Sequence, residues 1–164
     1  MTRLSKFQIK KMTKADVHEI FRLRGEFENY LQNLSDVDRE TLTSKREKRF
    51  LRDGFGRKPA FQGLIAKRGS STLGFIIFNL GYDPDEMHGR VAYVLDLFVT
   101  EKARRLGVGK ALMKSVARIC KKAGGIDIYF CVWKKNRSAF RFYNRLGAER
   151  INDMVWMDWP REKW

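Results

Sequence analysis

The sequence predicts an α/β protein of the α+β kind, with a mixed central sheet of about seven strands flanked by about four helices. The first observation is the length of 164 residues, which is that of one domain, so we expect residues 1–164 to form a single domain. The second is that segments of period two alternate with segments of period 3.6 in the order βααβββαβαββ. The third is a pair of strand signals around a short Gly-containing turn, which predicts a hairpin and a partly antiparallel sheet.

The N-terminal half is predicted to hold three strands and two helices, each with a local signal. Phe7 and Ile9 alternate with polar residues, as in a half-buried strand. Thr13 and Asp16 have the spacing of a capping box at a helix start, and Gly54 is typical of a helix end. The predicted ranges are a strand over 6–12, helices over 14–31 and 38–56, and strands over 60–67 and 72–82.

The C-terminal half is predicted to begin with a strand over residues 90–99, which is apolar on both faces and so should have neighbours on both sides. Apolar residues from Val108 to Ala123 then recur at the spacing of one helix face. The remaining predicted elements are a strand over 127–133, a helix over 136–147, and two terminal strands over 148–151 and 154–159.

The charge of the chain is unusual, because 34 Lys and Arg against 19 Asp and Glu give a formal net charge of +15. Such a field favours anionic partners such as a phosphorylated cofactor, with nucleic acid or an acidic protein as less favoured partners. We expect no membrane partner, because no segment approaches the roughly 20 apolar residues of a spanning helix, and no signal peptide is recognisable. Cys120 and Cys131 lie among apolar residues and are predicted to be buried free thiols. His18 and His88 stand apart, so no metal site is predicted.

A basic, Gly-rich turn joins the strand over 90–99 to the following helix. Gly107 and Gly109 allow an anion to approach the free N–H groups at the helix N-terminus, and Arg104 and Arg105 add positive charge. These features predict a pyrophosphate-binding turn. It is not a P-loop, because no Gly-Lys-Ser/Thr follows, and it lacks the third glycine of a dinucleotide fingerprint.

The R-x-x-G-x-G pattern at residues 104–109 resembles the acetyl-CoA signature of GNAT N-acetyltransferases. A second block, VWKKNRSAFRFYNRLGA over residues 132–148, is similar to the second conserved block of that family. The segments FLRDGFGRKPAF, LGFIIFNLGYDP and LDLFV resemble diamine (spermidine/spermine) acetyltransferases and their thialysine-acetylating relatives. The resemblance covers roughly residues 7–159. It implies a GNAT fold, acetyl-CoA as co-substrate without a metal, and a homodimer in the cytoplasm.

The resemblance also implies which residues bind acetyl-CoA. Main-chain groups of the strand before the turn would bind the pantetheine arm, and the turn would bind the pyrophosphate through backbone amides. Asn136 is predicted to cap its helix and to contact the cofactor arm. The cofactor-binding set is Leu97, Phe98, Val99, Arg104, Arg105, Leu106, Gly107, Val108, Gly109, Lys110, Asn136, Ala139 and Phe142.

Two catalytic residues are expected. Tyr143 lies on an apolar helix face, which core packing alone would explain, but the family pattern makes it the proton donor to the leaving thiolate. Asp96 is an acid inside an apolar strand, where burial is costly without a partner or a function, and it is the candidate base. A structural hydrogen bond is the alternative for Asp96, and Glu26 and Asp153 are weaker candidates for the base.

The acceptor site departs from the diamine acetyltransferase pattern at two positions. Leu95 stands where that branch has the first acid of a pair, and Leu31, after Tyr30, stands where it has another acid. A polyamine would lose attraction at both, so a smaller, less charged or zwitterionic amine is expected, with an acidic amine as a further alternative. The predicted acceptor-binding residues are Tyr30, Leu31, Leu95, Asp96 and Trp156.

The predicted function is therefore acetyl-CoA-dependent N-acetylation of a primary amine of a small molecule by direct attack. One alternative keeps the catalyst but changes the acceptor to a protein lysine or an aminoacyl-tRNA. Another is a non-catalytic acyl-CoA-binding protein that has lost activity along with the acids.

Overall fold

The computed structural model of the chain describes residues 7–32, 44–83, 89–152, 155, 157 and 159–163. Its centre is one five-stranded sheet with the spatial order β1-β2-β3-β4-β5. The strands are β1 (Gln8–Lys11), β2 (Gln62–Arg68), β3 (Ser71–Asp83), β4 (Gly89–Val99) and β5 (Asp127–Phe130).

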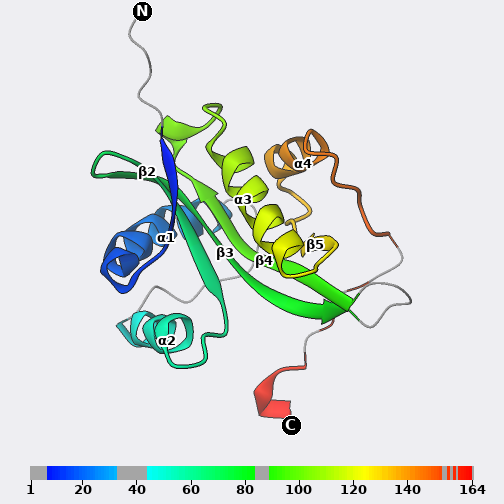
Figure 1. Cartoon of the computed structure of the whole chain (residues 1–164), viewed down its shortest axis with the longest axis horizontal. Coiled ribbons are helices and arrows are strands. Elements are labelled where there is room, and N and C mark those ends of the chain that lie inside the picture. Colours follow the sequence, from blue (N-terminus) through cyan, green and yellow to red (C-terminus); the bar gives the residue numbers. More distant parts are fainter. Residues whose placement is uncertain are drawn as a thin grey trace, which may run out of the picture.

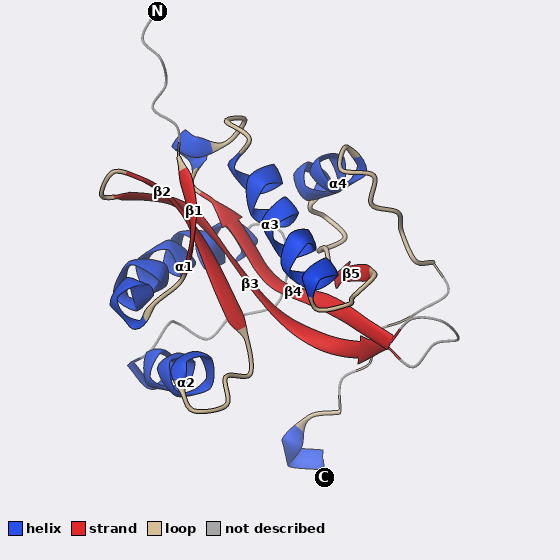
Figure 2. Ribbon diagram, in the orientation of Figure 1, coloured by secondary structure: helices blue, strands red, loops and turns tan. Residues whose placement is uncertain are grey.

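Helices cover both faces of this sheet (Figure 1). The helices α1 (Val17–Gln32) and α2 (Ser44–Phe55) lie on one face. The helices α3 (Val108–Lys122) and α4 (Arg137–Asn144) lie on the other face (Figure 2). Short 3-10 turns span Lys14–Asp16, Glu101–Ala103 and Arg161–Lys163. The layered α/β architecture and the element order through α4 confirm the sequence prediction.

The sheet is mixed. Strands β1 to β4 pair antiparallel, and β5 adds to β4 in parallel. The β3–β4 ladder contains a bulge, because Ile77 pairs with Asp96 while Phe78 pairs with Val94, which leaves Leu95 as the extra residue. A bulge of this kind re-aims the side chains that follow it. Asp96 therefore lies on the face of α1 and α2, whereas Val94 belongs to the core under α3.

Two apolar cores hold the layers together. The core between the sheet and α3 includes Phe78, Val94 and Leu112, and the α4 residues Phe142 and Tyr143 pack against it. The core on the other face includes Ile20, Phe75 and Phe98, with Phe50 of α2 packed against it. The local signals behave as predicted: the Asp16 carboxylate accepts hydrogen bonds from the Thr13 amide (2.9 Å) and hydroxyl (2.7 Å).

Three expectations are corrected. The strand predicted over 127–133 ends at Phe130, and residues 148–151 form no strand. Within 154–159 only residues 155, 157 and 159 are described, and none is in a strand. Alternating side chains signal a strand, but a strand also needs a neighbouring edge to bind its backbone groups. The described apolar side chains of the tail face solvent instead: Ile151, Val155, Met157 and Trp159 are 50%, 84%, 91% and 73% exposed.

The cysteine prediction is half right. Cys120 is buried, as expected for an α3 residue that faces the sheet, but Cys131 is exposed because the strand has already ended. Within the described ranges, no helix is both long enough and apolar enough to cross a membrane.

Candidate active site

The strands β4 and β5 part beside the bulge, where residues of both strands line a hollow, and we call this place the cleft. The two strands are paired from Val91 and Asp127 to Val94 and Phe130, and there the ladder stops. After the bulge, β4 continues into the turn at residues 104–107 that precedes α3. β5 instead leads to α4, so the two sequence blocks follow the two diverging strands, and we call the segments that carry them the two lips (Figure 1).

The turn before α3 has the geometry of an anion site. Arg105 and Gly107 both have positive φ, at 64° and 81°, the left-handed conformation that is found in backbone turns that bind anions. Gly107 is the N-cap of α3 and supplies no side-chain cap, so the first amides of a 15-residue helix remain available. A Cβ on Gly109 would lie 3.2 Å from the Phe142 ring, so this glycine also lets α4 pack close to α3.

Tyr30, at the C-terminal end of α1, contacts both lips. Its hydroxyl donates to Asn136 Oδ1 (3.1 Å), and the same oxygen accepts from the Ala139 amide (3.0 Å) as the cap of α4. The Arg104 guanidinium lies 5.2 Å from the centre of the Tyr30 ring, and its Nε donates to the Val99 carbonyl (3.3 Å). A residue expected in the acceptor site therefore lies against two residues expected to bind the cofactor.

Tyr143 lies on the α4 side of the cleft. Its ring stacks on Phe130 at a centroid distance of 4.1 Å and meets Phe142 edge-on at 4.9 Å. Among the described residues its hydroxyl has no hydrogen-bond partner. Burial raises the pKa of Tyr143 to about 12, so the phenol holds its proton at neutral pH. It is an acid kept protonated beside the last paired residue of β5.

Asp96 lies on the opposite face and is not free. Its carboxylate forms an ion pair and a hydrogen bond with Arg24 of α1. Burial raises the pKa of the Asp96 carboxyl, and the charge and hydrogen bond of Arg24 oppose that rise. The structural hydrogen bond that the sequence left as an alternative is therefore present.

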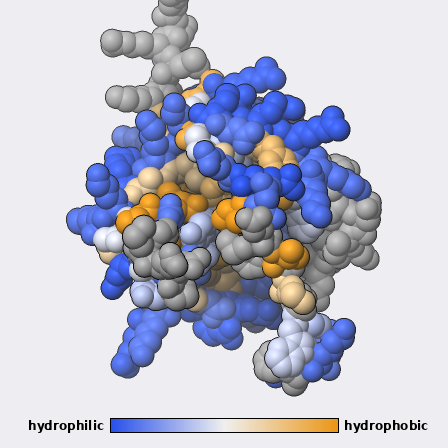
Figure 3. All heavy atoms as spheres, turned by 90° about the vertical axis from the view of Figure 1, so that its right-hand side faces the viewer, coloured by the Kyte–Doolittle hydropathy of each residue, from blue (hydrophilic) through white to orange (hydrophobic). Residues whose placement is uncertain are grey.

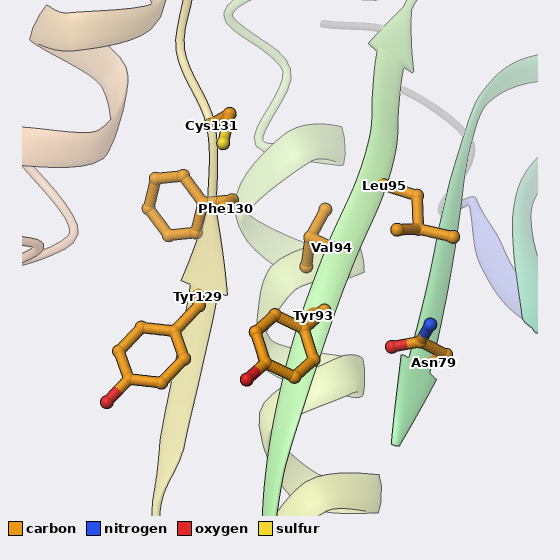
Figure 4. Close-up of a pocket in the computed structure, with 7 residues that line it drawn as sticks. All are labelled: Asn79, Tyr93, Val94, Leu95, Tyr129, Phe130 and Cys131. Carbon is orange, nitrogen blue, oxygen red and sulfur yellow. The ribbon is translucent and has the colours of Figure 1, made fainter. Parts of the chain in front are cut away.

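A hollow of about 360 Å³ opens on the same face as Asp96, beside the bulge. Figure 4 shows Asn79 from β3, Tyr93, Val94 and Leu95 from β4, and Tyr129, Phe130 and Cys131 from β5 and the residue after it. The rings of Tyr93 and Tyr129 are 5.7 Å apart, and their hydroxyls point the same way. None of these seven side chains carries a full charge at neutral pH. Figure 3 shows apolar side chains gathered in the middle of the face that it views, surrounded by hydrophilic ones.

The remaining predicted residues divide into three groups. Leu97 and Val99 pack into the α3 core and Phe98 into the α1 core, as expected if only their main chain serves the site. Leu106 on the turn and Lys110 in the first turn of α3 are exposed, whereas Val108, the first residue of α3, is buried.

Two predicted acceptor residues cannot be placed. The backbone of Leu31 continues α1, but its side chain lies outside the described part of the structure, and so does Trp156. The weaker base candidate Asp153 is also outside the described residues. Glu26 forms a salt bridge with Arg22 on the surface of α1.

Sequence reasoning missed Arg24 and the hollow residues Asn79, Tyr93 and Tyr129. Arg24 had a signal, because it stands between Ile20 and Phe27 at the spacing of the inward face of α1. A charged residue at such a position needs a buried partner, and Asp96 is that partner. No cluster of three or more His, Cys, Asp or Glu that could hold a metal occurs in the described part of the chain.

Comparison with known proteins gives the same family as the motifs. Residues 19–148 match the Acetyltransferase (GNAT) family. Human spermidine/spermine N(1)-acetyltransferase-like protein 1 is 30% identical over 154 residues, which cover 90% of this chain but only 21% of that protein. This chain therefore corresponds to about a fifth of that relative. Bovine thialysine N-epsilon-acetyltransferase is 26% identical over 156 residues, covering 88% of this chain and 85% of the relative.

A solved structure supports the fold. AAC(6')-Iy in complex with the bisubstrate analog CoA-S-monomethyl-acetylneamine has a TM-score of 0.71 at 17% sequence identity. The match covers 95% of this chain and 99% of that one. At this identity the likeness speaks for the fold alone.

Proposed function

This chain belongs to the GNAT acetyltransferase family and is an acetyltransferase, and from that premise we propose that it transfers an acetyl group from acetyl-CoA to a primary amine of a small molecule. The observation that carries the proposal is the cleft between β4 and β5. One of its lips leads to the basic, positive-φ turn before α3, and the other carries a buried phenol whose pKa is about 12. We further propose that residues 1–164 act as one catalytic domain.

The names of the relatives support a small amine as the acceptor. The human relative is named for spermidine and spermine, and the bovine one for thialysine. Since this chain spans 21% of the human relative and 85% of the bovine one, the bovine protein is the better guide to a whole enzyme. Both Leu31 and Leu95 differ from the acids expected in that branch, so a less cationic acceptor than a polyamine is proposed.

The residues of the turn fit the donor. Acetyl-CoA supplies an activated thioester, and its pyrophosphate would be held by the amides of residues 105–110 at the N-terminus of α3. Arg104 and Asn136 border the cleft from its two lips and would contact the arm of the cofactor. The main chain of β4 from Leu97 to Val99, which lies beyond the end of the ladder with β5, would hold the pantetheine. The match to the GNAT acetyltransferase family supports this choice of donor.

The proposed acetyl transfer uses Tyr143 on the α4 side of the sheet and Asp96 on the α1 side. The amine loses a proton, and its lone pair forms a C–N bond to the thioester carbonyl carbon. As the C–S bond breaks, the thiolate takes the proton of Tyr143, which is a better donor to a thiolate inside the cleft than solvent at neutral pH. Attack is direct, with no acetyl group on the enzyme.

The proton of the amine leaves toward the side of Asp96, directly or through water. Burial raises the pKa of the Asp96 carboxyl, which favours uptake of a proton, while the charge and hydrogen bond of Arg24 oppose that rise. Its fixed ion pair also makes it a weaker base than a free buried carboxylate.

Two proposals concern the state of the protein in the cell. We expect a homodimer, supported by the exposed apolar side chains of the tail, including Val155 and Met157. We expect the cytoplasm, supported by two free cysteines and by the resemblance to cytoplasmic diamine acetyltransferases.

Release of free thiol from acetyl-CoA across a panel of amines tests the function. The panel contains spermidine, thialysine, small monoamines, acidic amines and a basic peptide, and wild type is measured beside Tyr143→Phe. We expect turnover on a small-amine class, with a fall in kcat of ~10²-fold or more in the variant. Tyr82→Phe is the matched control, because Tyr82 is 69% exposed on β3.

Turnover on the basic peptide alone would indicate that the acceptor is a protein lysine and not a small amine. Binding of acetyl-CoA without turnover on any amine would favour a non-catalytic acyl-CoA-binding protein. An unchanged kcat in Tyr143→Phe would remove the tyrosine from the proposed mechanism while leaving the activity in place.

A further inference from the structure

Four charged side chains meet between α1, α2 and the bulge of β4, and we call them the charge quartet: Arg24, Glu28, Arg46 and Asp96. Arg24 pairs with Asp96, and their side chains are 18% and 21% exposed. Arg46 Nη2 lies 3.1 Å from Glu28 Oε1, with side chains 30% and 14% exposed. The charges of Glu28 and Arg46 also act on the Asp96 carboxyl, so the two pairs form one electrostatic unit.

The quartet is electrically balanced, with two positive and two negative groups. This balance matters because the whole chain carries +15, and any cationic substrate must overcome that field. A substrate ammonium gains most from a carboxylate that has no other partner. Both carboxylates of the quartet already have an arginine.

Asp96 cannot bind a substrate ammonium group without breaking its ion pair with Arg24, and breaking that pair costs free energy. Separating a mostly buried pair leaves the arginine uncompensated in a region of low dielectric, which is strongly unfavourable. The Arg24 guanidinium is also held from its other side, 6.0 Å from the centre of the Phe50 ring. Asp96 is therefore fixed in place and does not attract a second ammonium group.

The hollow beside the bulge offers a substrate ammonium no net negative charge either. Leu95, 53% exposed, joins Asp96 to the hollow, and Tyr93 and Tyr129 form an aromatic wall. Asn79 contributes the one amide of the lining, and its Oδ1 is buried without a hydrogen-bond partner among the described residues. Such a lining favours an apolar or aromatic substituent, with one acceptor atom for an N–H group.

One carboxylate lies near the Tyr129 hydroxyl. Burial raises the pKa of Tyr129, and Asp83, which is hydrogen-bonded to that hydroxyl, raises it further together with the charge of Asp127. A diamine long enough to reach Asp83 is therefore the competing ligand class. Asp83 already accepts a hydrogen bond from the Tyr129 hydroxyl, so the balance of contacts favours a ligand with one charge.

Resting on the acetyltransferase function proposed above, we propose that Arg24 is the residue that sets the acceptor class. By neutralising Asp96 within a balanced quartet beside an aromatic hollow, it selects primary amines with one positive charge and an apolar or aromatic substituent. Diamines are discriminated against, because both described carboxylates at the bulge, those of Asp96 and Glu28, are already paired with an arginine.

The test compares kcat/KM for 2-phenylethylamine and 1,4-diaminobutane on the same enzyme preparation. The ratio of the two constants cancels a general loss of activity. Wild type is expected to favour 2-phenylethylamine by about tenfold or more, and Arg24→Leu to shift the ratio toward the diamine by about tenfold. Arg24→Lys keeps the charge and is the matched control, with a ratio close to that of wild type.

A second variant covers the case in which Arg24→Leu does not fold. Arg46→Leu removes the more exposed arginine, leaves the quartet with a net negative charge, and keeps the Arg24–Asp96 pair. A shift toward the diamine of a few-fold is expected there. An unchanged ratio in folded Arg24→Leu, or in Arg46→Leu where Arg24→Leu fails to fold, overturns the role of the quartet.

Binding separates this inference from the proposed activity. Calorimetric titration of the CoA-bound protein with the same two amines needs no turnover. Tighter binding of 2-phenylethylamine supports the inference even if no amine is acetylated, a result that would defeat only the proposed reaction. Tighter binding of 1,4-diaminobutane that is lost in Asp83→Asn, or binding of neither amine, overturns it.

Discussion

At the scale of the residue, burial fixes the protonation of Tyr143 and with it the pH range of the reaction. With a pKa of about 12, the phenol keeps its proton while amine acceptors lose theirs. We expect kcat to rise with pH as the acceptor is deprotonated, without an alkaline fall below about pH 11. Rates of thiol release measured over this range test the prediction, and a fall with an apparent pKa near the ordinary tyrosine value would contradict it.

The same shift predicts how stability changes at high pH. The folded-state pKa is raised from 10.0 to about 12, so the unfolded chain loses this proton first as the pH rises. The stabilising effect is complete below about pH 10 and is lost as the pH rises toward 12, by on the order of 3 kcal/mol. Tyr143→Phe has no proton to lose. Urea unfolding of both proteins should therefore show the free energy of unfolding of wild type falling relative to the variant between these pH values.

Gly107 allows a test of the turn itself. Its φ of 81° strains any other residue, and a Cβ there would meet nothing within 4 Å. Gly107→Ala should cost about 1 kcal/mol of stability from conformation alone. It should also weaken CoA binding, because the backbone relaxes away from the geometry that presents its amides.

Gly124 is the matched control for that experiment. It has a φ of 79° and equally open space, at the other end of α3. Gly124→Ala should therefore cost similar stability and leave CoA affinity unchanged. Equal CoA affinities in the two variants, measured by calorimetry, would show that the turn does not hold the cofactor.

At the scale of the element, α1 links the two sides of the site. Tyr30 touches Arg104 on one lip and Asn136 on the other, while Arg24, nearly two turns earlier, holds Asp96. Tyr30→Phe keeps the ring and removes only the hydroxyl bond to the cap of α4. We expect CoA affinity to fall about 3- to 10-fold, the value of one hydrogen bond. The CoA affinities of wild type and of Tyr82→Phe serve as the baseline. A change in the KM of the amine alone would show that Tyr30 acts in acceptor binding and not in CoA binding.

Elements with a local signal could be predicted from the sequence. The helix expected over 108–123 is observed over Val108–Lys122, and Asn136 caps α4 as expected. The β2–β3 hairpin and its turn are also confirmed. These signals come from neighbours within one or two turns of chain, so no knowledge of the tertiary structure is needed.

Contacts between distant segments could not be predicted in the same way. Arg24 and Asp96 are 72 residues apart, and Tyr30 and Asn136 are 106 apart. Motif spacing identified the turn and Tyr143, whose roles stay predictions. It did not indicate that Arg24 is the cation that pairs with Asp96. The strand predicted over 148–151 was wrong for a related reason, because the pattern of side chains does not reveal whether a sheet edge is available.

At the scale of the whole molecule, the described part of the C-terminal tail exposes large apolar side chains. Val155 and Met157 are 84% and 91% exposed, beyond what scattered surface residues usually show. In the proposed homodimer these side chains would be buried, so wild type should sediment with twice the mass of the 19.3 kDa chain. Val155→Lys with Met157→Lys should shift the protein to a monomer, because two buried charges in an interface are costly.

Ile126→Lys, at a residue that is 58% exposed after α3, is the control and should stay dimeric. Sedimentation velocity distinguishes the outcomes, and a monomeric wild type at high protein concentration would contradict the dimer.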